Sequence, residues 1–125
     1  MPRGTGAIVN VSSVNGTLPV NGVAYTTSKG AVNTMTRNIA IRLSGTAIRC
    51  NAIAPGVTDT DAAAAWSSGQ QVGGSKMLEF AEKYVNMTVP ITRPIDQANA
   101  ALYLASDMGR CVTGQVLQVD NGGWL

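Results

Sequence analysis

The fold is decided by residues 6–56, which read GAIVNVSSVNGTLPVNGVAYTTSKGAVNTMTRNIAIRLSGTAIRCNAIAPG. Residues 6–12 form a short apolar run without strict polar alternation, which is typical of a buried strand in a parallel sheet. From Ala24 to Leu43 apolar residues recur every three or four positions, which predicts a long helix. Residues 48–53 predict a second strand, and the turn formers at 15–22 predict a loop. This stretch therefore predicts a β-α-β unit.

The second half of the chain predicts a lid, a helix and a strand. Residues 61–84 begin as a small, polar, Gly-rich stretch and end in a short amphipathic helix over 77–84, so this segment is a candidate mobile substrate lid. Residues 115–119 alternate like a strand and precede a turn at 120–123. The order β-α-β-lid-α-β predicts an α/β fold with a parallel sheet and right-handed crossovers.

Two of the predicted helices have an apolar face that we expect to pack in the interior. On the long helix this face consists of Val32, Met35, Ile39 and Leu43. On the last helix, which begins near Asp96, it consists of Ala98, Ala101, Leu102 and Ala105.

Composition excludes several classes of protein. The chain has 125 residues, 45% hydrophobic and 13% charged, which indicates one globular domain over residues 1–125. The formal net charge is only +2 and the basic residues are scattered, so we expect no nucleic-acid partner. With no histidine and two distant cysteines, we expect no metal site.

The cysteines and the hydropathy indicate a compartment. Cys50 and Cys111 are interpreted as two reduced, partly buried thiols of a cytosolic protein. We find no signal-peptide pattern and no apolar run long enough to cross a bilayer. The expectation is a cytoplasmic protein without a membrane partner.

Three polar residues suggest acid-base chemistry. Tyr25 and Lys29 are four positions apart on the long helix, so their side chains share one face, and an ammonium favours the phenolate form of a nearby tyrosine. Ser13 follows the first strand, where it can present its hydroxyl to a substrate oxygen. Each signal alone is weak: Tyr25 can be a half-buried helix residue, Lys29 a solvated one and Ser13 a turn or cap residue.

The order of the motifs is more informative than any one of them. The chain contains in succession NVSSVNG at 10–16, AYTTSKGAV at 24–32 and IRCNAIAPGVTDT at 48–60, with ASD, VTGQ and VDNGG near its end. In this order the motifs resemble the short-chain dehydrogenase/reductase family across essentially the whole chain. That resemblance implies the C-terminal part of a Rossmann-like doubly wound parallel sheet.

The resemblance also implies roles for the residues of one site. Tyr25 is expected to act as general acid in reduction and as general base in oxidation. Lys29 is expected to bind the nicotinamide ribose, and Ser13 to hydrogen-bond the reacting carbonyl or hydroxyl. The residues expected to contact the nicotinamide end of NAD or NADP are Tyr25, Lys29, Pro55, Gly56, Val57 and Thr60. The implied substrate is a small-molecule alcohol or ketone.

The chain departs from the family pattern in its first residues. The family binds the cofactor pyrophosphate with a Gly-rich turn at a helix N-terminus, whereas Gly4-Thr5-Gly6 precedes a strand. We therefore expect this chain to lack the N-terminal half of the family fold, to be catalytically inactive alone, and to form a homo-oligomer or bind a complementary chain. The alternative is a non-catalytic half-fold that acts as an interaction module, or the product of a truncated or decayed gene.

Overall fold

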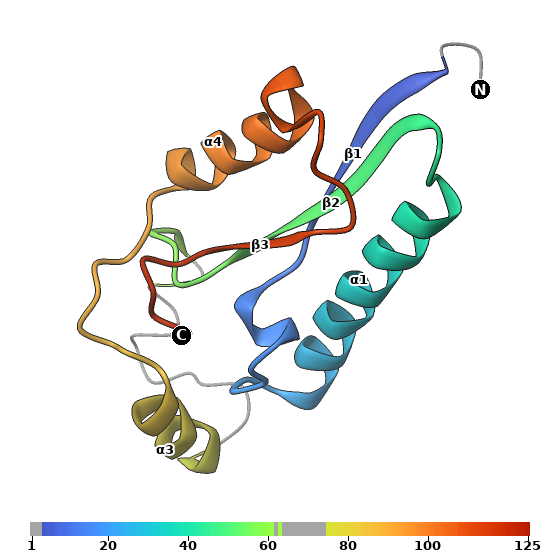
Figure 1. Cartoon of the computed structure of the whole chain (residues 1–125). Helices are drawn as coiled ribbons and strands as arrows, with labels where there is room; N and C mark the ends of the chain where they lie inside the picture. Colours follow the sequence, from blue (N-terminus) through green and yellow to red (C-terminus); the bar gives the residue numbers. More distant parts are fainter. Residues whose placement is uncertain (1–3, 62, 64–74) are drawn as a thin grey trace.

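A computed structural model of the chain describes residues 4–61, 63 and 75–125. At its centre is a parallel sheet with the strand order β1-β2-β3 (Figure 1). The strands are β1 (Thr5–Val11), β2 (Ala47–Pro55) and β3 (Val116–Val119). The three predicted strands are confirmed, with ends that differ from the prediction by one or two residues.

Parallel pairing brings the carboxyl ends of the strands to one edge of the sheet. Along the ladder between β1 and β2, Thr5 pairs with Ala47 and Val11 pairs with Ile53. The shorter β3 pairs only with the second half of β2, up to Pro55. The segments that follow β1 and β2 therefore emerge side by side.

The long helix α1 (Val23–Arg42) confirms the predicted helix but buries a different face. Its fully buried residues are Asn33, Thr36 and Ala40. Met35, which was expected to be buried, is 45% exposed, and the rest of the predicted apolar face is only partly buried. The prediction of that face was wrong because Thr36 and Asn33 face the sheet instead, where their side chains hydrogen-bond with Asn10 and Ser12.

Helix α4 (Pro94–Ala105) also presents a different face from the one predicted. Leu104 is its only fully buried residue, whereas Leu102 is 60% exposed. Ala98 and Ala105 are exposed as well. Apolar periodicity failed here because nearly every residue of this short helix is small or apolar, so several faces look equally suitable for burial.

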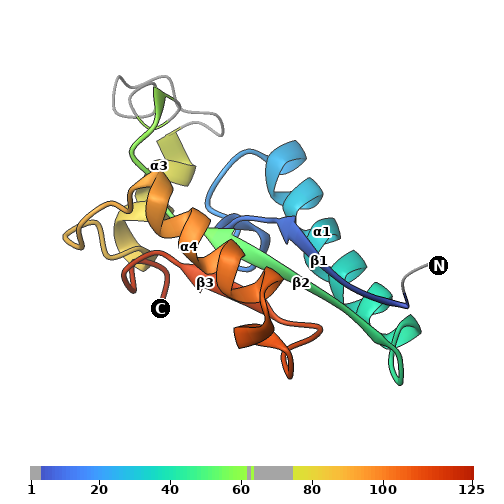
Figure 2. The ribbon, with the colours of Figure 1, turned by 90° about the horizontal axis from the view of Figure 1, so that it is seen from above.

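The two helices cover opposite faces of the sheet (Figures 1 and 2). On the α1 side, the Asn10 amide donates to Thr36 Oγ1 (2.9 Å) and contacts Cys50 Sγ. The preceding residue, Arg49, points the other way and donates to Leu104 O of α4 at 2.7 Å.

This arrangement gives the two crossovers opposite hands, since both move the same way across the sheet. The expectation of right-handed crossovers is thus wrong for one of them. That rule holds for a helix that packs directly back onto the sheet, but the connection from β2 to β3 includes α3 (Ser75–Tyr84) as well as α4.

Two shorter elements complete the part of the chain that the structure describes. The predicted loop at 15–22 begins with a 3-10 turn, η1 (Val14–Gly16), and a second one, η2 (Asp107–Gly109), follows α4. Of the predicted lid, α3 is described, but 62 and 64–74 lie outside the described residues. None of the described helices is both long enough and apolar enough to cross a membrane.

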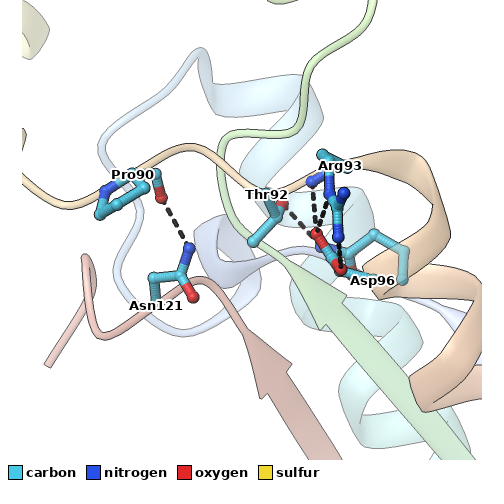
Figure 3. Close-up of polar contacts among 6 residues, drawn as sticks. Pro90, Thr92, Arg93, Asp96 and Asn121 are labelled. Atoms are coloured by element: carbon cyan, nitrogen blue, oxygen red, sulfur yellow. Dashed lines mark hydrogen bonds and ion pairs between the residues drawn. The ribbon is translucent and has the colours of Figure 1, made fainter.

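The turn after β3 ties the C-terminal end to the segment before α4. The Asn121 amide donates to Pro90 O at 2.7 Å (Figure 3). Asp120 accepts from the backbone N–H groups of Gly122 and Trp124. Residues 120–124 are therefore a fixed turn that positions Trp124.

Candidate active site

A cleft of about 420 Å³ opens where the carboxyl ends of β1 and β2 meet the N-terminal turns of α1. Ligands of open α/β sheets bind at such an edge. All the residues predicted for the site line this cleft, namely Ser13, Tyr25, Lys29, Pro55, Gly56, Val57 and Thr60. The structure therefore brings together every candidate residue, and their roles stay predictions.

Ser13 is held in place by the turn that it begins. It is buried, has extended backbone and caps η1, and its Oγ accepts from the Asn15 N–H at 3.1 Å. The turn lies close against α1, because a Cβ on Gly16 would be 2.8 Å from Lys29 O. Only glycine permits this approach, which brings the loop that carries Ser13 against the helix turn that carries Lys29.

Tyr25 and Lys29 lie in the first two turns of α1. Lys29 Nζ is 5.7 Å from the centroid of the Tyr25 ring and donates to Val11 O at 3.1 Å. Tyr25 is 41% exposed, and its hydroxyl makes no hydrogen bond with any residue that the structure describes. The Lys29 ammonium is thus fixed between strand end and tyrosine ring, while the phenol hydroxyl is left for another partner.

A buried polar network behind the cleft was missed by the sequence analysis. The Ser12 hydroxyl lies within hydrogen-bond distance of Asn33 Oδ1 and of Lys29 O. Thr36 Oγ1 accepts from the Asn10 amide and donates to Val32 O. These bonds fix the position of α1 along β1. The only feature of the sequence that could have predicted this network was the spacing of Asn33 and Thr36, three positions apart on the helix. An analysis of apolar periodicity does not consider polar residues.

The segment after β2 forms the second wall of the cleft. Gly56 N donates to Val119 O at 3.0 Å, and a Cβ on Gly56 would lie 2.5 Å from Asp120 Cβ, so only glycine fits here. Thr58 pairs with Thr92, their hydroxyl oxygens being 3.0 Å apart. Thr60 is exposed and its hydroxyl donates to Thr58 O at 3.2 Å. Residues 55–57 are therefore held in a rigid frame along the cleft, because the Gly56 N–H, the Gly56 carbonyl and the Val57 carbonyl are already hydrogen-bonded.

Other residues of the cleft were not assigned beforehand. Asn15, Asn21 and Trp124 line it, and among the lining residues that the structure describes Lys29 is the only one with a charged side chain. Asn15 belongs to a motif that the sequence analysis quoted, but nothing there singled out its amide. Trp124 reaches the cleft only through the turn after β3, a placement that no local pattern predicts.

Comparison with known proteins identifies the family. The family described as Enoyl-(Acyl carrier protein) reductase matches residues 1–123. A 7alpha-hydroxysteroid dehydrogenase of Clostridium sardiniense is 38% identical over 123 residues, which cover 95% of this chain and 43% of that protein.

Solved structures agree with the sequence match. A 3-oxoacyl-[acyl-carrier protein] reductase from Brucella melitensis ATCC 23457 superposes with a TM-score of 0.75 at 31% identity, covering 96% of this chain and 42% of that one. A 3-ketoacyl-(acyl-carrier-protein) reductase from Brucella melitensis, complexed with NADH, superposes with a TM-score of 0.73 at 28% identity, covering 95% and 44%.

The matches extend over nearly all of this chain, which spans about half the length of the curated relatives it matches. With a family match over 123 residues and the same fold in the solved structures, this chain belongs to the short-chain dehydrogenase/reductase family of oxidoreductases.

Proposed function

We propose that this chain carries the catalytic half of an NAD(P)-dependent oxidoreductase that interconverts an alcohol and a ketone in a small molecule. The observation that supports this most is that Ser13, Tyr25 and Lys29 all line the same cleft. Family membership supports it independently, since the relatives include hydroxysteroid dehydrogenases.

In this proposal Tyr25 transfers the proton. During oxidation the substrate hydroxyl proton passes to the Tyr25 oxygen, the carbinol hydrogen leaves with its electron pair, and a C=O bond forms. In reduction Tyr25 returns the proton to the carbonyl oxygen. The Ser13 hydroxyl donates to that oxygen, and the Lys29 ammonium lies 5.7 Å from the centroid of the Tyr25 ring, close to the residue that transfers the proton.

The same cleft suits the nicotinamide end of NAD or NADP, which supplies or accepts the hydride when it is bound. Lys29 offers ammonium donors in the cleft, and Gly56 lines the opposite wall, where its missing Cβ allows close packing against Asp120. The residues that would hold the cofactor are Tyr25, Lys29, Pro55, Gly56, Val57 and Thr60.

We also propose that the 125-residue chain by itself is inactive. In the described part of the chain, no Gly-rich turn leads from a strand into a helix N-terminus, and Thr5 of the Gly4-Thr5-Gly6 pair is already in β1. Calorimetric titration of this chain with NAD(H) and NADP(H) should show no binding tighter than about millimolar. Micromolar binding would contradict this part of the proposal.

The decisive test of the catalytic assignment is Tyr25→Phe. Activity is measured with the 125-residue chain and with any longer natural polypeptide that contains it, using NAD(P)H absorbance. Loss of the proton donor should lower kcat by about 10²–10⁴-fold, with an unchanged circular dichroism spectrum because Tyr25 is partly exposed. Tyr103→Phe on α4 is the matched control. Retention of activity in Tyr25→Phe to within about threefold would rule out the role of Tyr25.

Association with a second copy or a complementary chain is part of the proposal. Among the described strands β1 has a partner on one side only, and Val11 at its end is exposed. Met35 and Ile41 leave apolar surface on α1. The same observations favour the alternative, a non-catalytic interaction module, which would associate but show no NAD(P)-linked turnover in any form. A compact monomer at micromolar concentration in sedimentation would contradict both.

We also propose a cytoplasmic location and a substrate lid for this protein. Both cysteines are free thiols, which fits a cytoplasmic protein. Residues 61–84 are proposed as the substrate lid; their described part includes Ala63, which lines the cleft, and α3.

A further inference from the structure

The second wall of the cleft is connected to α4 by the side chain of Gln97, which lies near the start of that helix and is half-buried. The Gln97 amide nitrogen donates to Thr92 Oγ1 at 2.9 Å and to Val119 O, at the end of β3, at 3.0 Å. It also lies 3.4 Å from the hydroxyl oxygen of Thr58, a residue that lines the cleft. One side chain thus joins α4, the segment before it, the end of β3 and the wall itself.

The chemistry of the partners fixes the orientation of the Gln97 amide. Val119 O is a carbonyl oxygen and can only accept, so the nitrogen of the amide, and not its oxygen, faces it. The Thr92 hydroxyl donates to Val57 O at 3.0 Å, which leaves Thr92 Oγ1 as the acceptor for Gln97. Only a side chain with two N–H donors can bind both acceptors, and an acid or an apolar residue at position 97 cannot.

The two residues that Gln97 binds are also the residues to which the wall is attached. Three backbone hydrogen bonds make these attachments, from Gly56 N to Val119 O (3.0 Å), from Thr92 N to Val57 O (3.0 Å) and from Asp59 N to Thr92 O (2.8 Å). By binding Thr92 and Val119 together, Gln97 therefore holds both attachments in one relative position. The wall that they hold lines the cleft with residues 56–58.

The same contacts add little to the overall stability of the chain. Without the Gln97 amide, Val119 O still accepts from the Gly56 N–H, and the Thr92 hydroxyl still donates to Val57 O. Gln97 Oε1 is buried and has no hydrogen-bond partner in the part of the chain that the structure describes, which is unfavourable for an amide. The amide at position 97 thus affects where the wall lies more than it affects the free energy of unfolding.

We propose that Gln97 is a positioning residue of this site, which fixes the wall formed by residues 56–58 for the nicotinamide end of NAD or NADP. The proposal rests on the proposed function, which assigns Gly56 and Val57 to the cofactor. Gln97 is not among the described residues that line the cleft, so it acts only through the wall. Its loss should weaken binding of the cofactor and leave Ser13 and Tyr25, which belong to other segments, in place.

Hydrogen exchange, followed by NMR in the isotope-labelled 125-residue chain, tests this proposal without turnover. Gln97→Met keeps the length of the side chain and removes its N–H donors. We expect the backbone amide protons of Gly56, Asp59 and Thr92 to exchange at least about fivefold faster in this variant, because the wall opens locally more often. Unchanged exchange at these three amides would overturn the proposal.

Two controls show whether the effect is confined to the wall. The Ser12 N–H, which donates to Ile53 O, should exchange at the wild-type rate in Gln97→Met. Gln115→Met is the matched variant, because the Gln115 amide also donates to a backbone carbonyl, that of Thr113, but on an exposed segment that does not line the cleft. It should leave the exchange of the wall unchanged.

The melting temperature separates positioning from general stabilisation. In Gln97→Met it should stay within about 2 °C of the wild type or rise, since no partner of Gln97 loses its last hydrogen bond and the unpaired Oε1 is removed. A lower melting temperature with faster exchange at Ser12 as well as in the wall would show a merely structural role and would overturn the proposal.

A pair of substitutions at Thr92 tests the hydrogen bond itself. Thr92 is buried, and Thr92→Val replaces the hydroxyl that Gln97 binds with a methyl group of similar size, whereas Thr92→Ser keeps the hydroxyl. Thr92→Val should reproduce the faster exchange at Gly56 and Asp59, and Thr92→Ser should stay within about twofold of the wild-type rates. If Thr92→Ser behaves like Thr92→Val, packing of the methyl group holds the wall and the proposal fails.

Steady-state kinetics separate this proposal from the proposed function. In any longer natural polypeptide that contains the chain and is active, Gln97→Met should raise KM for NAD(P)H at least about fivefold and change KM for the alcohol or ketone by less than about twofold. An unchanged cofactor KM would overturn the role of Gln97 and leave the catalytic assignment of Tyr25 untouched. Full turnover in Tyr25→Phe together with a raised cofactor KM in Gln97→Met would overturn the assignment of Tyr25 alone.

Discussion

The two helices that cover the sheet are attached to it in different ways. Helix α1 buries Asn33 and Thr36, whose side chains hydrogen-bond with Ser12 and Asn10 of the β1 segment. Helix α4 buries one large apolar residue, Leu104, and its C-terminal end receives a cation.

The cation on the α4 side is the Arg49 guanidinium. It donates to Leu104 O at 2.7 Å and to Ser106 O at 3.1 Å, and so completes carbonyls at the end of the helix. The Arg49 guanidinium thus fixes only the C-terminal end of α4. In contrast, the hydrogen bonds of Asn33 and Thr36 fix the position of α1 along β1.

This difference corresponds to what each helix carries. Tyr25 and Lys29 extend from α1 into the cleft, and a slip of one position along β1 would separate them from Ser13. Hydrogen bonds between individual side chains oppose such a slip, because only one alignment satisfies them all. No residue of α4 lines the cleft, and this helix is held by the buried Leu104, by the Arg49 guanidinium at its C-terminal end and by Gln97, whose amide donates to Val119 O at 3.0 Å.

The largest expected effect on stability comes from truncating Leu104, the fully buried residue of α4. Leu104→Ala should lower the free energy of unfolding by about 2–5 kcal/mol, because it leaves a cavity at a fully buried site. Urea denaturation followed by circular dichroism measures this change. Leu102→Ala on the exposed side of the same helix should change it by less than about 0.5 kcal/mol. Equal effects would mean that α4 packs through a different face.

The corresponding change on the other side of the sheet is Asn33→Leu. Loss of the acceptor for Ser12 should lower the free energy of unfolding by about 1–3 kcal/mol, toward the lower end because Ser12 also reaches Lys29 O. The NMR signals of Tyr25 and Lys29 should shift as well, since α1 loses its alignment with β1. Asn38→Leu, on the exposed side of α1, is the control. Unchanged Tyr25 and Lys29 signals would show that the network does not position the site.

A smaller, pH-dependent effect should come from Cys50, which lies beneath α1 and contacts the Asn10 amide. Burial raises the pKa of the Cys50 thiol above its ordinary range. The stability that this contributes is complete below the ordinary thiol pKa of about 8.5 and is lost as the pH rises through the raised value, because the unfolded chain releases its proton first. The free energy of unfolding should therefore fall more steeply at alkaline pH in the wild type than in Cys50→Ala. Parallel curves would contradict this.

The smallest effect is expected at the exposed start of α4. The Arg93 N–H and guanidinium lower the pKa of Asp96, which closes the first turn of the helix. Its contribution is present above the ordinary aspartate pKa of about 3.9 and is lost as the pH falls through the lowered value. Asp96→Asn should slightly lower the melting temperature at neutral pH but not in acid. Glu82→Gln on α3 should not change the melting temperature in this way. An equal change in melting temperature in both variants would show that the contact between Asp96 and Arg93 does not stabilise the helix.

The predicted strands were close to those observed for an identifiable reason. Residues 6–12 and 48–53 lie within one or two residues of β1 and β2, because a continuous apolar run has few other stable states. The residues that we predicted for the site line one cleft, because parallel strands bring their carboxyl ends to the same edge of the sheet.

The errors concern contacts between distant segments. Apolar periodicity pointed to Met35 and Leu102, but both are substantially exposed, and the buried residues of the two helices are instead Asn33, Thr36, Ala40 and Leu104. A polar residue on a helix is buried only when a partner on another element satisfies it, and that partner is invisible to a local pattern.

By itself the sequence determined the order of strands and helices, the family and the residues expected to carry the chemistry, because these depend on local periodicity and on motifs in a recognisable order. Only the tertiary structure decided that α1 and α4 cover opposite faces, that Ser12 and Asn33 align α1 with β1, and that Trp124 joins the cleft from the far end of the chain. These contacts join residues distant in the chain, and their energies depend on burial and hydrogen-bond geometry that exist only after the elements have packed.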